Sequence, residues 1–176
     1  MDFEFTLEFK LPPDITDADE AVEKLGSRGC TDAMVGLGQP GYLGLDFIRT
    51  ANTAQEALLS ALDDVQTALP GAILVEAGPD YVGLTDVADV VGQSRQNLRK
   101  LMLRHHQRFP APVHSGNPSL WRLAQVLEFL RERQVEFPAP VFEVALTTMQ
   151  INLARQQPLV DLQLAARLSA RLSALA

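Results

Sequence analysis

A basic segment near the middle of the chain, QSRQNLRKLMLRHH at residues 93–106, combines side chains that contact nucleic acid. Long, flexible cations neutralise phosphates, and amide side chains hydrogen-bond to base edges. If the segment is helical, Leu98 and Leu101 lie on one buried face and the polar residues project outward or sideways. The helix start also offers free backbone N–H groups to a phosphate. We therefore expect these residues to contact DNA: Ser94, Arg95, Gln96, Asn97, Arg99, Lys100 and Arg104.

A second, shorter helix is predicted just before this segment, in LTDVADVV at residues 84–91. Thr85 is its expected cap, and the small Ala88 allows a close approach between the two helices. Gly92 suits a sharp turn, and Ser94 is the expected N-cap of the second helix. Two helices joined by three or four residues that include a glycine form a helix-turn-helix.

The residues that follow predict a hairpin. FPAPV at 109–113 is expected to be extended, because residues before prolines avoid the helical region. HSGN at 114–117 is a turn, and SLWR at 119–122 returns as a short strand. The helix expected next has an inward face of Leu123, Val126, Leu127 and Leu130. A hairpin in this place corresponds to a wing.

Three pieces, GLTDVADVVGQSRQNLRKL, FPAPV and LWRLAQVLEFL, resemble winged helix-turn-helix proteins of the AlpA/excisionase type, which are related to the MerR DNA-binding domain. The resemblance covers residues 83–133 and departs at Gln93, where the family prefers an aliphatic residue, and at Gln125, where an acid is common. It implies DNA recognition by the helix at 94–104. The wing residues that it implies are His114 and Ser115, and we include Asn117 of the same turn.

Other interpretations of the same residues are possible. Helical hairpins with one basic face also occur in proteins that do not bind DNA, but the hairpin signature and the local charge favour DNA. Adjacent histidines on a helix, His105 and His106, cannot both face one metal ion, and no cysteine or carboxylate completes a set. Phosphate-facing or helix-end roles fit them better. Trp121 is expected to anchor the core or the wing.

Charge is distributed unevenly along the chain, although the net charge is −7. Residues 1–80 contain 15 acidic and 4 basic residues, whereas residues 81–136 contain 5 acidic and 8 basic residues. Only local charge matters to a polyanion, so the second region fits DNA. The single cysteine, Cys30, fits a reducing compartment and a structural thiol. The acidic, alternating N-terminus does not resemble a signal peptide, and a cytoplasmic location without membrane attachment is expected.

The acidic region predicts the order β-α-β-β-α-β across residues 2–78. DFEFTLEFKL alternates apolar and polar residues, which is typical of a half-buried strand. The first helix is expected within 14–29, with Asp14 or Thr16 as N-cap and Gly26 at its end. The segment GLGQPG at 36–41 matches a dinucleotide-binding pattern, but a proline and a strand follow it, so we expect a hairpin. The order resembles the ferredoxin-like split βαβ sandwich.

The C-terminal region predicts two helices separated at Pro158. The last helix is apolar over a wide face, which must be covered by its own domain or by another copy. Dimerisation through these helices would give a DNA-binding module two half-sites. The leucines concerned are Leu159, Leu162, Leu164, Leu168, Leu172 and Leu175.

We therefore predict an α+β protein with a ferredoxin-like domain at 1–79, a winged helix-turn-helix at 80–136 and C-terminal helices at 137–176. The expected function is a transcription regulator that reads double-stranded DNA, forms a homodimer, and binds a protein partner or small effector through its first domain. The alternative is an adaptor or antitoxin-like protein whose acidic domain captures a basic partner. No set of catalytic residues, metal ligands or cofactor-binding residues is evident, so neither enzyme activity nor a cofactor is expected.

Overall fold

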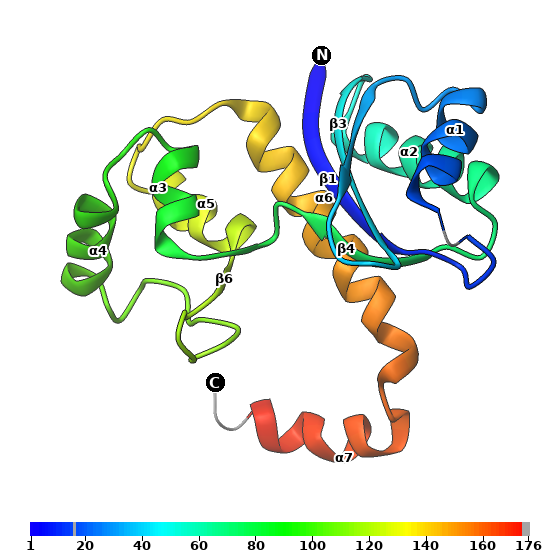
Figure 1. Cartoon of the computed structure of the whole chain (residues 1–176). Coiled ribbons are helices and arrows are strands. Elements are labelled where there is room, and N and C mark those ends of the chain that lie inside the picture. The colour runs from blue at the N-terminus through cyan, green and yellow to red at the C-terminus, as the bar shows by residue number, and fades with distance from the viewer. Residues whose placement is uncertain (16, 174–176) are drawn as a thin grey trace.

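The computed structural model describes residues 1–15 and 17–173 and confirms the α+β class (Figure 1). The first part of the chain contains β1 (Asp2–Lys10), α1 (Ala18–Ser27), β2 (Ala33–Leu37), β3 (Tyr42–Thr50), α2 (Ala54–Ala68) and β4 (Ile73–Gly78). The second part contains β5 (Tyr81–Val82), α3 (Leu84–Val90), α4 (Arg95–Arg104), β6 (Trp121–Arg122) and α5 (Leu123–Arg131). The chain continues with α6 (Ala139–Gln156), the 3-10 turn η1 (Gln157–Leu159) and α7 (Leu162–Ser173).

The four long strands form one antiparallel sheet in the order β2-β3-β1-β4. Side chains alternate along β1, so Phe3, Phe5, Leu7 and Phe9 are buried while the residues between them are exposed. Helices α1 and α2 cover the buried face, and the ring of Phe5 stacks on that of Phe47 with centroids 5.1 Å apart. The alternating pattern therefore predicts the buried face of β1 correctly.

The glycine-rich segment at 36–41 connects β2 to β3 as a hairpin, as predicted. Gly36 lies opposite Gly44, and Leu37 lies opposite Leu43. Gly41 has φ = +81°, a left-handed conformation that glycine adopts without steric cost. A strand rather than a helix follows the turn, so no helix N-terminus is available there for a pyrophosphate.

The start of α1 differs from the sequence prediction. Asp17 is the N-cap, because its side chain accepts a hydrogen bond from the Asp19 N–H at 3.0 Å, and Asp14 is therefore not the cap. Thr16, the other predicted cap, lies outside the described residues. The helix also continues past Gly26 to Ser27. Aspartate and threonine are both favoured as N-caps, aspartate somewhat more, so a run containing several of them leaves the first residue of the helix undetermined.

A second hydrophobic core lies between α3, α4, α5 and part of α6. Strands β5 and β6 pair antiparallel, with Tyr81 opposite Arg122 and Val82 opposite Trp121. This pairing holds the chain entering α3 beside the chain entering α5. The four leucine and valine residues predicted to face inward from α5 are fully buried: Leu123, Val126, Leu127 and Leu130.

Helix α6 packs on both cores. Val144 belongs to the core under the sheet, and Ala145 belongs to the second core. The Asn152 side chain accepts a hydrogen bond from the Ala77 N–H at 2.9 Å and donates one to the Ala77 carbonyl at 2.8 Å. The amide thus pairs with the edge of β4 much as a neighbouring strand would, and α6 covers that edge.

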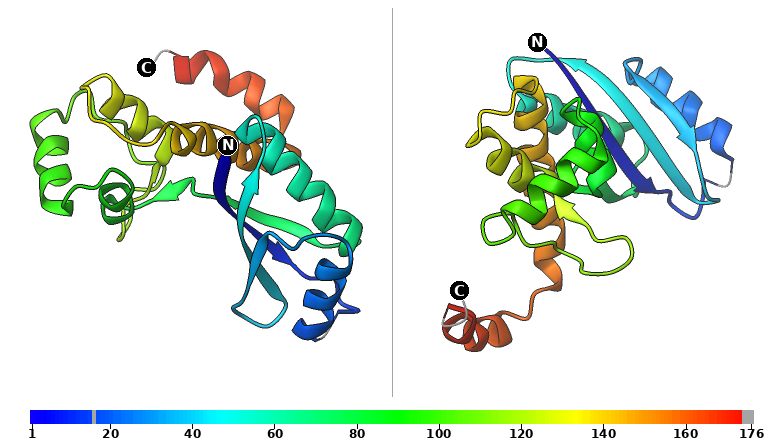
Figure 2. Two further views of the ribbon diagram at one scale, coloured as in Figure 1. Left: turned by 90° about the horizontal axis from the view of Figure 1, so that it is seen from above. Right: turned by 90° about the vertical axis from the view of Figure 1, so that its left-hand side faces the viewer.

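Helix α7 lies apart from the sheet and from the second core in both the front and side views (Figures 1 and 2). Its four described leucines, Leu162, Leu164, Leu168 and Leu172, are all exposed, and so is Leu159 in the turn before it. Leu175 lies outside the described residues. Across the described residues, none of the helices combines the length and apolarity that crossing a bilayer requires.

Candidate nucleic-acid interface

Helices α3 and α4 are joined by a tight turn at residues 91–94. Gly92 has φ = +63°, and the N–H of Gln93 donates to the Ala88 carbonyl at 2.8 Å. The Ser94 hydroxyl accepts a hydrogen bond from the Asn97 N–H at 3.2 Å and caps α4, as predicted. The expected roles of Gly92 and Ser94 are therefore confirmed.

The start of α3 differs from the prediction. Gly83 precedes the helix, so Thr85 lies inside its first turn rather than at the cap. The carboxylate of Asp86 accepts a hydrogen bond from the Gly83 N–H at 2.7 Å. A carboxylate three residues into the helix thus satisfies the backbone at the start, and a threonine cap is not needed.

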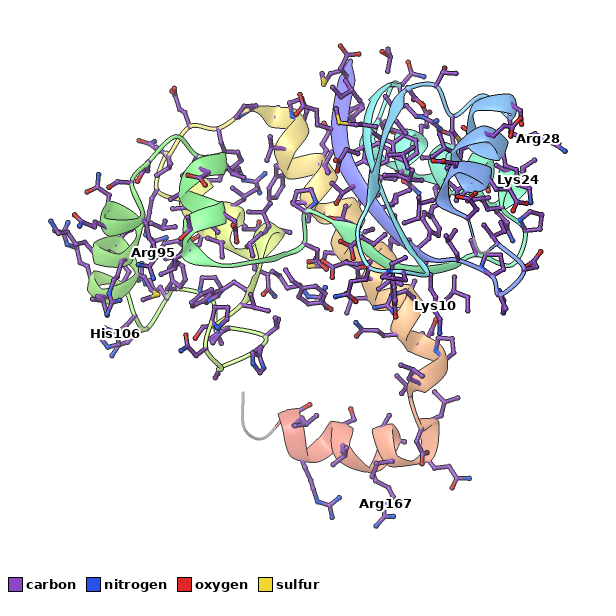
Figure 3. The ribbon with its side chains drawn as sticks, viewed as in Figure 1. Lys10, Lys24, Arg28, Arg95, His106 and Arg167 are labelled. Carbon is purple, nitrogen blue, oxygen red and sulfur yellow. The ribbon has the colours of Figure 1, made fainter. Side chains whose placement is uncertain are left out.

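One side of α4 is anchored and the other is in solvent. Leu98 is fully buried, and Leu101 and Met102 pack partly buried against the second core. Figure 1 shows α4 at the end of the molecule far from the four-stranded sheet, and Figure 3 labels Arg95 on this helix and His106 just beyond its C-terminal end. All seven residues predicted here to contact DNA are exposed: Ser94, Arg95, Gln96, Asn97, Arg99, Lys100 and Arg104.

Residues 93–120 contain five cationic side chains and no aspartate or glutamate. In the described part of the chain, none of these cations forms a salt bridge with an acid. Arg108, which is exposed, belongs to this set although it is absent from the predicted contacts. The sequence feature that could have identified Arg108 is its position in the same run without acids.

Two arginines that follow this run, Arg122 and Arg131, are paired with acids. Arg122 is buried and pairs with Asp80, which is also buried. Arg131 pairs with Glu128 at 3.1 Å. Asp80 and Arg122 thus form one ion pair although they fall on opposite sides of the boundary at residue 80. Within residues 81–136, the positive charge without a salt bridge lies on α4 and on the residues just after it.

The predicted wing is a short hairpin fixed to the second core. The Leu120 N–H donates to the His114 carbonyl at 3.0 Å, and the Val113 N–H donates to the Leu120 carbonyl at 2.8 Å. The indole N–H of Trp121 donates to the Pro110 carbonyl at 3.1 Å, and its ring meets Phe109 edge to face. Trp121 therefore anchors both the core and the hairpin. The three residues predicted to contact DNA here are all exposed: His114, Ser115 and Asn117.

The residues predicted to contact DNA thus lie on two elements, α4 and the hairpin, and both elements pack on the second core. The two adjacent histidines differ: His105 is half-buried at the end of α4 with its ring edge-on to Phe129, whereas His106 is exposed. Among the residues that the structure describes, no group of three or more histidine, cysteine or acidic side chains is arranged to hold a metal ion.

A buried polar network lies where the sheet meets the second core. The Asp80 carboxylate accepts hydrogen bonds from Arg122 and, at 2.8 Å, from the Asn152 amide. The Asp80 carbonyl also accepts the first N–H of α5, from Leu123, at 2.8 Å. Sequence reasoning missed this network, because its members are far apart in the chain and Arg122, although it lies in the LWRLAQVLEFL piece, was counted there only as a basic residue.

In the core under the sheet, Cys30 is buried, and burial together with the nearby Asp64 raises the pKa of its thiol. A raised pKa keeps the sulfur protonated and unreactive, consistent with a structural thiol. The open face of the sheet carries acids instead. Glu8 lies directly opposite Glu76, and burial, Glu8 and Asp80 together raise the pKa of Glu76.

Comparisons with known protein families, with curated proteins and with solved structures find no match to this chain.

Proposed function

We propose that this chain is a cytoplasmic transcription regulator that binds double-stranded DNA in a sequence-specific manner. In this proposal residues 80–136 form a winged helix-turn-helix, with α4 as the recognition helix and the hairpin at 113–120 as the wing. The four-stranded sheet with α1 and α2 is a ferredoxin-like domain, which its strand order β2-β3-β1-β4 supports.

One observation carries the proposal: an exposed helix face and the loop after it bear five cations and no acids, in a chain with net charge −7. Solvation alone accounts poorly for this pattern, because surfaces of soluble proteins usually intersperse both signs of charge. Cations without acidic partners attract a polyanion and release its counterions on binding. The anchored side of α4 fixes the direction in which this face points.

The proposed mechanism divides the contacts by chemistry. Arg95, Arg99, Lys100 and Arg104 neutralise phosphates, while Gln96 and Asn97 hydrogen-bond to base edges in the major groove. The Ser94 hydroxyl and the first N–H groups of α4 are suited to a phosphate at the groove edge. The wing residues His114, Ser115 and Asn117 approach the neighbouring backbone or minor groove.

Fluorescence anisotropy tests the proposal, with duplex from upstream of the chain's own gene and a scrambled duplex of equal composition. We expect tighter binding to the upstream duplex. If about four phosphates are neutralised, the logarithm of the binding constant falls with the logarithm of salt concentration with a slope of about −4. Lack of binding to either duplex at low salt would refute the proposal.

Three substitutions separate base reading from phosphate contact. Gln96→Ala and Asn97→Ala are expected to reduce the preference for the upstream duplex by about 1–3 kcal/mol each while leaving scrambled DNA bound nearly as before. Arg99→Ala is expected to weaken both duplexes alike and to reduce the salt slope by about 1. Arg131→Ala is the matched control, because Arg131 is exposed on the same module but pairs with Glu128 on α5. Equal losses on both duplexes for all three variants contradict this division.

A second candidate function rests on the open face of the sheet. Glu4, Glu8 and Asp46 are exposed there, and the pKa of Glu76 is raised by burial and by its acidic neighbours. An adaptor or antitoxin-like protein could use this face to capture a basic protein partner, with DNA binding autoregulatory or absent. Lysine substitution of Glu8 and Asp46 would then abolish co-purification of that partner, whereas it would leave the DNA affinity of α4 unchanged.

A further inference from the structure

Helix α7 presents a continuous apolar stripe to solvent. Leu164, Leu168 and Leu172 recur every four residues on one side of the helix, with exposed fractions of 48%, 39% and 60%. Arg167 and Arg171 lie on the flank beside the stripe, and residues 162–173 contain no acid. A helix of 12 residues is marginal in water unless its apolar side is packed. The stripe therefore requires a covering surface.

A groove of about 350 Å³ between α2 and α6 has the matching character. No charged side chain lines it, and its walls are formed by Gln55, Leu59, Leu146, Thr147, Gln150, Ile151 and Ala154. Leu59 and Leu146 are 47% and 37% exposed, so the groove presents two large apolar side chains to solvent. Residues 144–154 of α6 contain no charged residue at all. Depletion of charge around exposed apolar residues is the composition of an interface centre.

The stripe and the groove are also similar in length, and the charges beside them are opposite in sign. Along α6 the groove runs from residue 146 to residue 154, and the stripe runs from 164 to 172, so each covers about 12 Å at the α-helical rise. On α2, Glu56 and Asp63 lie three residues before and four residues after Leu59, next to the groove. Helix α2 has three acids and no base, whereas α7 has two arginines and no acid.

We propose that α7 docks into the α2–α6 groove of a second copy of this chain. Two copies related by a two-fold axis exchange their α7 helices, so each groove is filled once and each stripe is covered once. The leucines pack on Leu59 and Leu146, and the two arginines face the acids of α2. A second copy is favoured because, in the structure, α7 follows the end of α6 that lies farther from α2 and does not turn back toward the groove (Figure 1). These surfaces are separate from α4, so this inference stands independently of DNA binding.

Light scattering coupled to gel filtration measures the mass of the full chain without DNA, over a range of micromolar concentrations. We expect a dimer, and Leu168→Asp is expected to weaken dimerisation at least tenfold while the fluorescence of Trp121, which lies in the second core, stays unchanged. Leu162→Asp is the matched control, because Leu162 lies on α7 outside the stripe, is 76% exposed and should leave the dimer intact. A monomeric wild-type chain at all concentrations, or equal effects of both variants, overturns the proposal.

A cysteine pair identifies the occupant of the groove. The native Cys30 is buried, so the double variant Leu59→Cys/Leu168→Cys supplies the reactive thiols. Oxidation is expected to yield a covalent dimer for the double variant and none for either single variant. A covalent dimer of Leu168→Cys alone shows that two α7 helices pair with each other, and a disulfide within a monomer shows that α7 covers its own groove. Either result overturns the exchange.

Discussion

Replacement of Asn152 by alanine tests how strongly α6 is bound to the sheet and to the second core. The substitution removes three hydrogen bonds, with the N–H of Ala77 at 2.9 Å, the carbonyl of Ala77 at 2.8 Å and the Asp80 carboxylate at 2.8 Å. Ala77 is fully buried and Asp80 is 1% exposed, so their polar groups cannot simply turn to bulk water.

The cost follows from the groups that lose their partners. A buried polar group without a hydrogen bond costs about 1–3 kcal/mol, and two backbone groups of Ala77 are affected. Asp80 keeps its bond from Arg122, and water entering the space of the lost side chain offsets part of the cost. We therefore expect Asn152→Ala to lower the free energy of unfolding by about 3 kcal/mol, a large part of the roughly 5–15 kcal/mol typical of a folded domain.

Urea unfolding measures this loss, with circular dichroism reporting on all helices and the fluorescence of Trp121 reporting on the second core. Both signals are expected to shift together, by about 1.5 M urea for a slope near 2 kcal/mol per molar. Leu153→Ala is the control, since Leu153 is 45% exposed on the same helix and should cost less than about 1 kcal/mol. An Asn152→Ala loss as small as that of the control would refute the role assigned to this amide.

Two further predictions concern charged side chains within residues 1–80. The pKa of Glu76 is raised by burial, Glu8 and Asp80, so its ionisation costs stability as the pH rises above about 4. Because Glu76 is only half-buried and solvent screens its repulsion from Glu8, Glu76→Gln should stabilise the chain by less than about 1 kcal/mol at pH 7 and not at all at pH 3. The Arg49 guanidinium donates a hydrogen bond to Asp32 at 2.7 Å and lowers the pKa of that carboxyl. The contribution of this ion pair to stability is therefore present at neutral pH, and it is lost as the pH falls below about 4 through the lowered pKa. Asp32→Asn should therefore lower the melting temperature at pH 7 by several degrees and by much less at pH 2. Thermal unfolding across this pH range checks both, and a pH-independent difference in either variant contradicts the assigned cause.

Local patterns in the sequence were sufficient for most of the elements. The alternation of β1 determines its buried face, because successive side chains of a strand point to opposite sides. The leucine spacing of α4 and the cap at Ser94 likewise determine which side chains are exposed. For the same reason all ten residues predicted to contact DNA lie in solvent, since each of them was chosen for its place on a polar face or in a polar turn.

Helix starts were less well determined, because competing caps lie close together. Asp17 caps α1 although Asp14 was also suitable, and the Asp86 carboxylate serves α3 where Thr85 was expected. Differences of this kind amount to fractions of a kcal/mol, and tertiary packing decides among them.

Tertiary structure alone decided how the parts are joined. Asn152 appears in the sequence as one polar residue in an apolar helix, yet it pairs with Ala77, 75 residues away. Arg122 adds to the basic count of its region, yet it is buried against Asp80. Local sequence specifies such side chains but not their partners, because the partners meet only when β4, β6 and α6 pack together. Helix α7 shows the converse: its stripe is evident from the leucine spacing, but only the folded chain shows that its own core leaves the stripe uncovered.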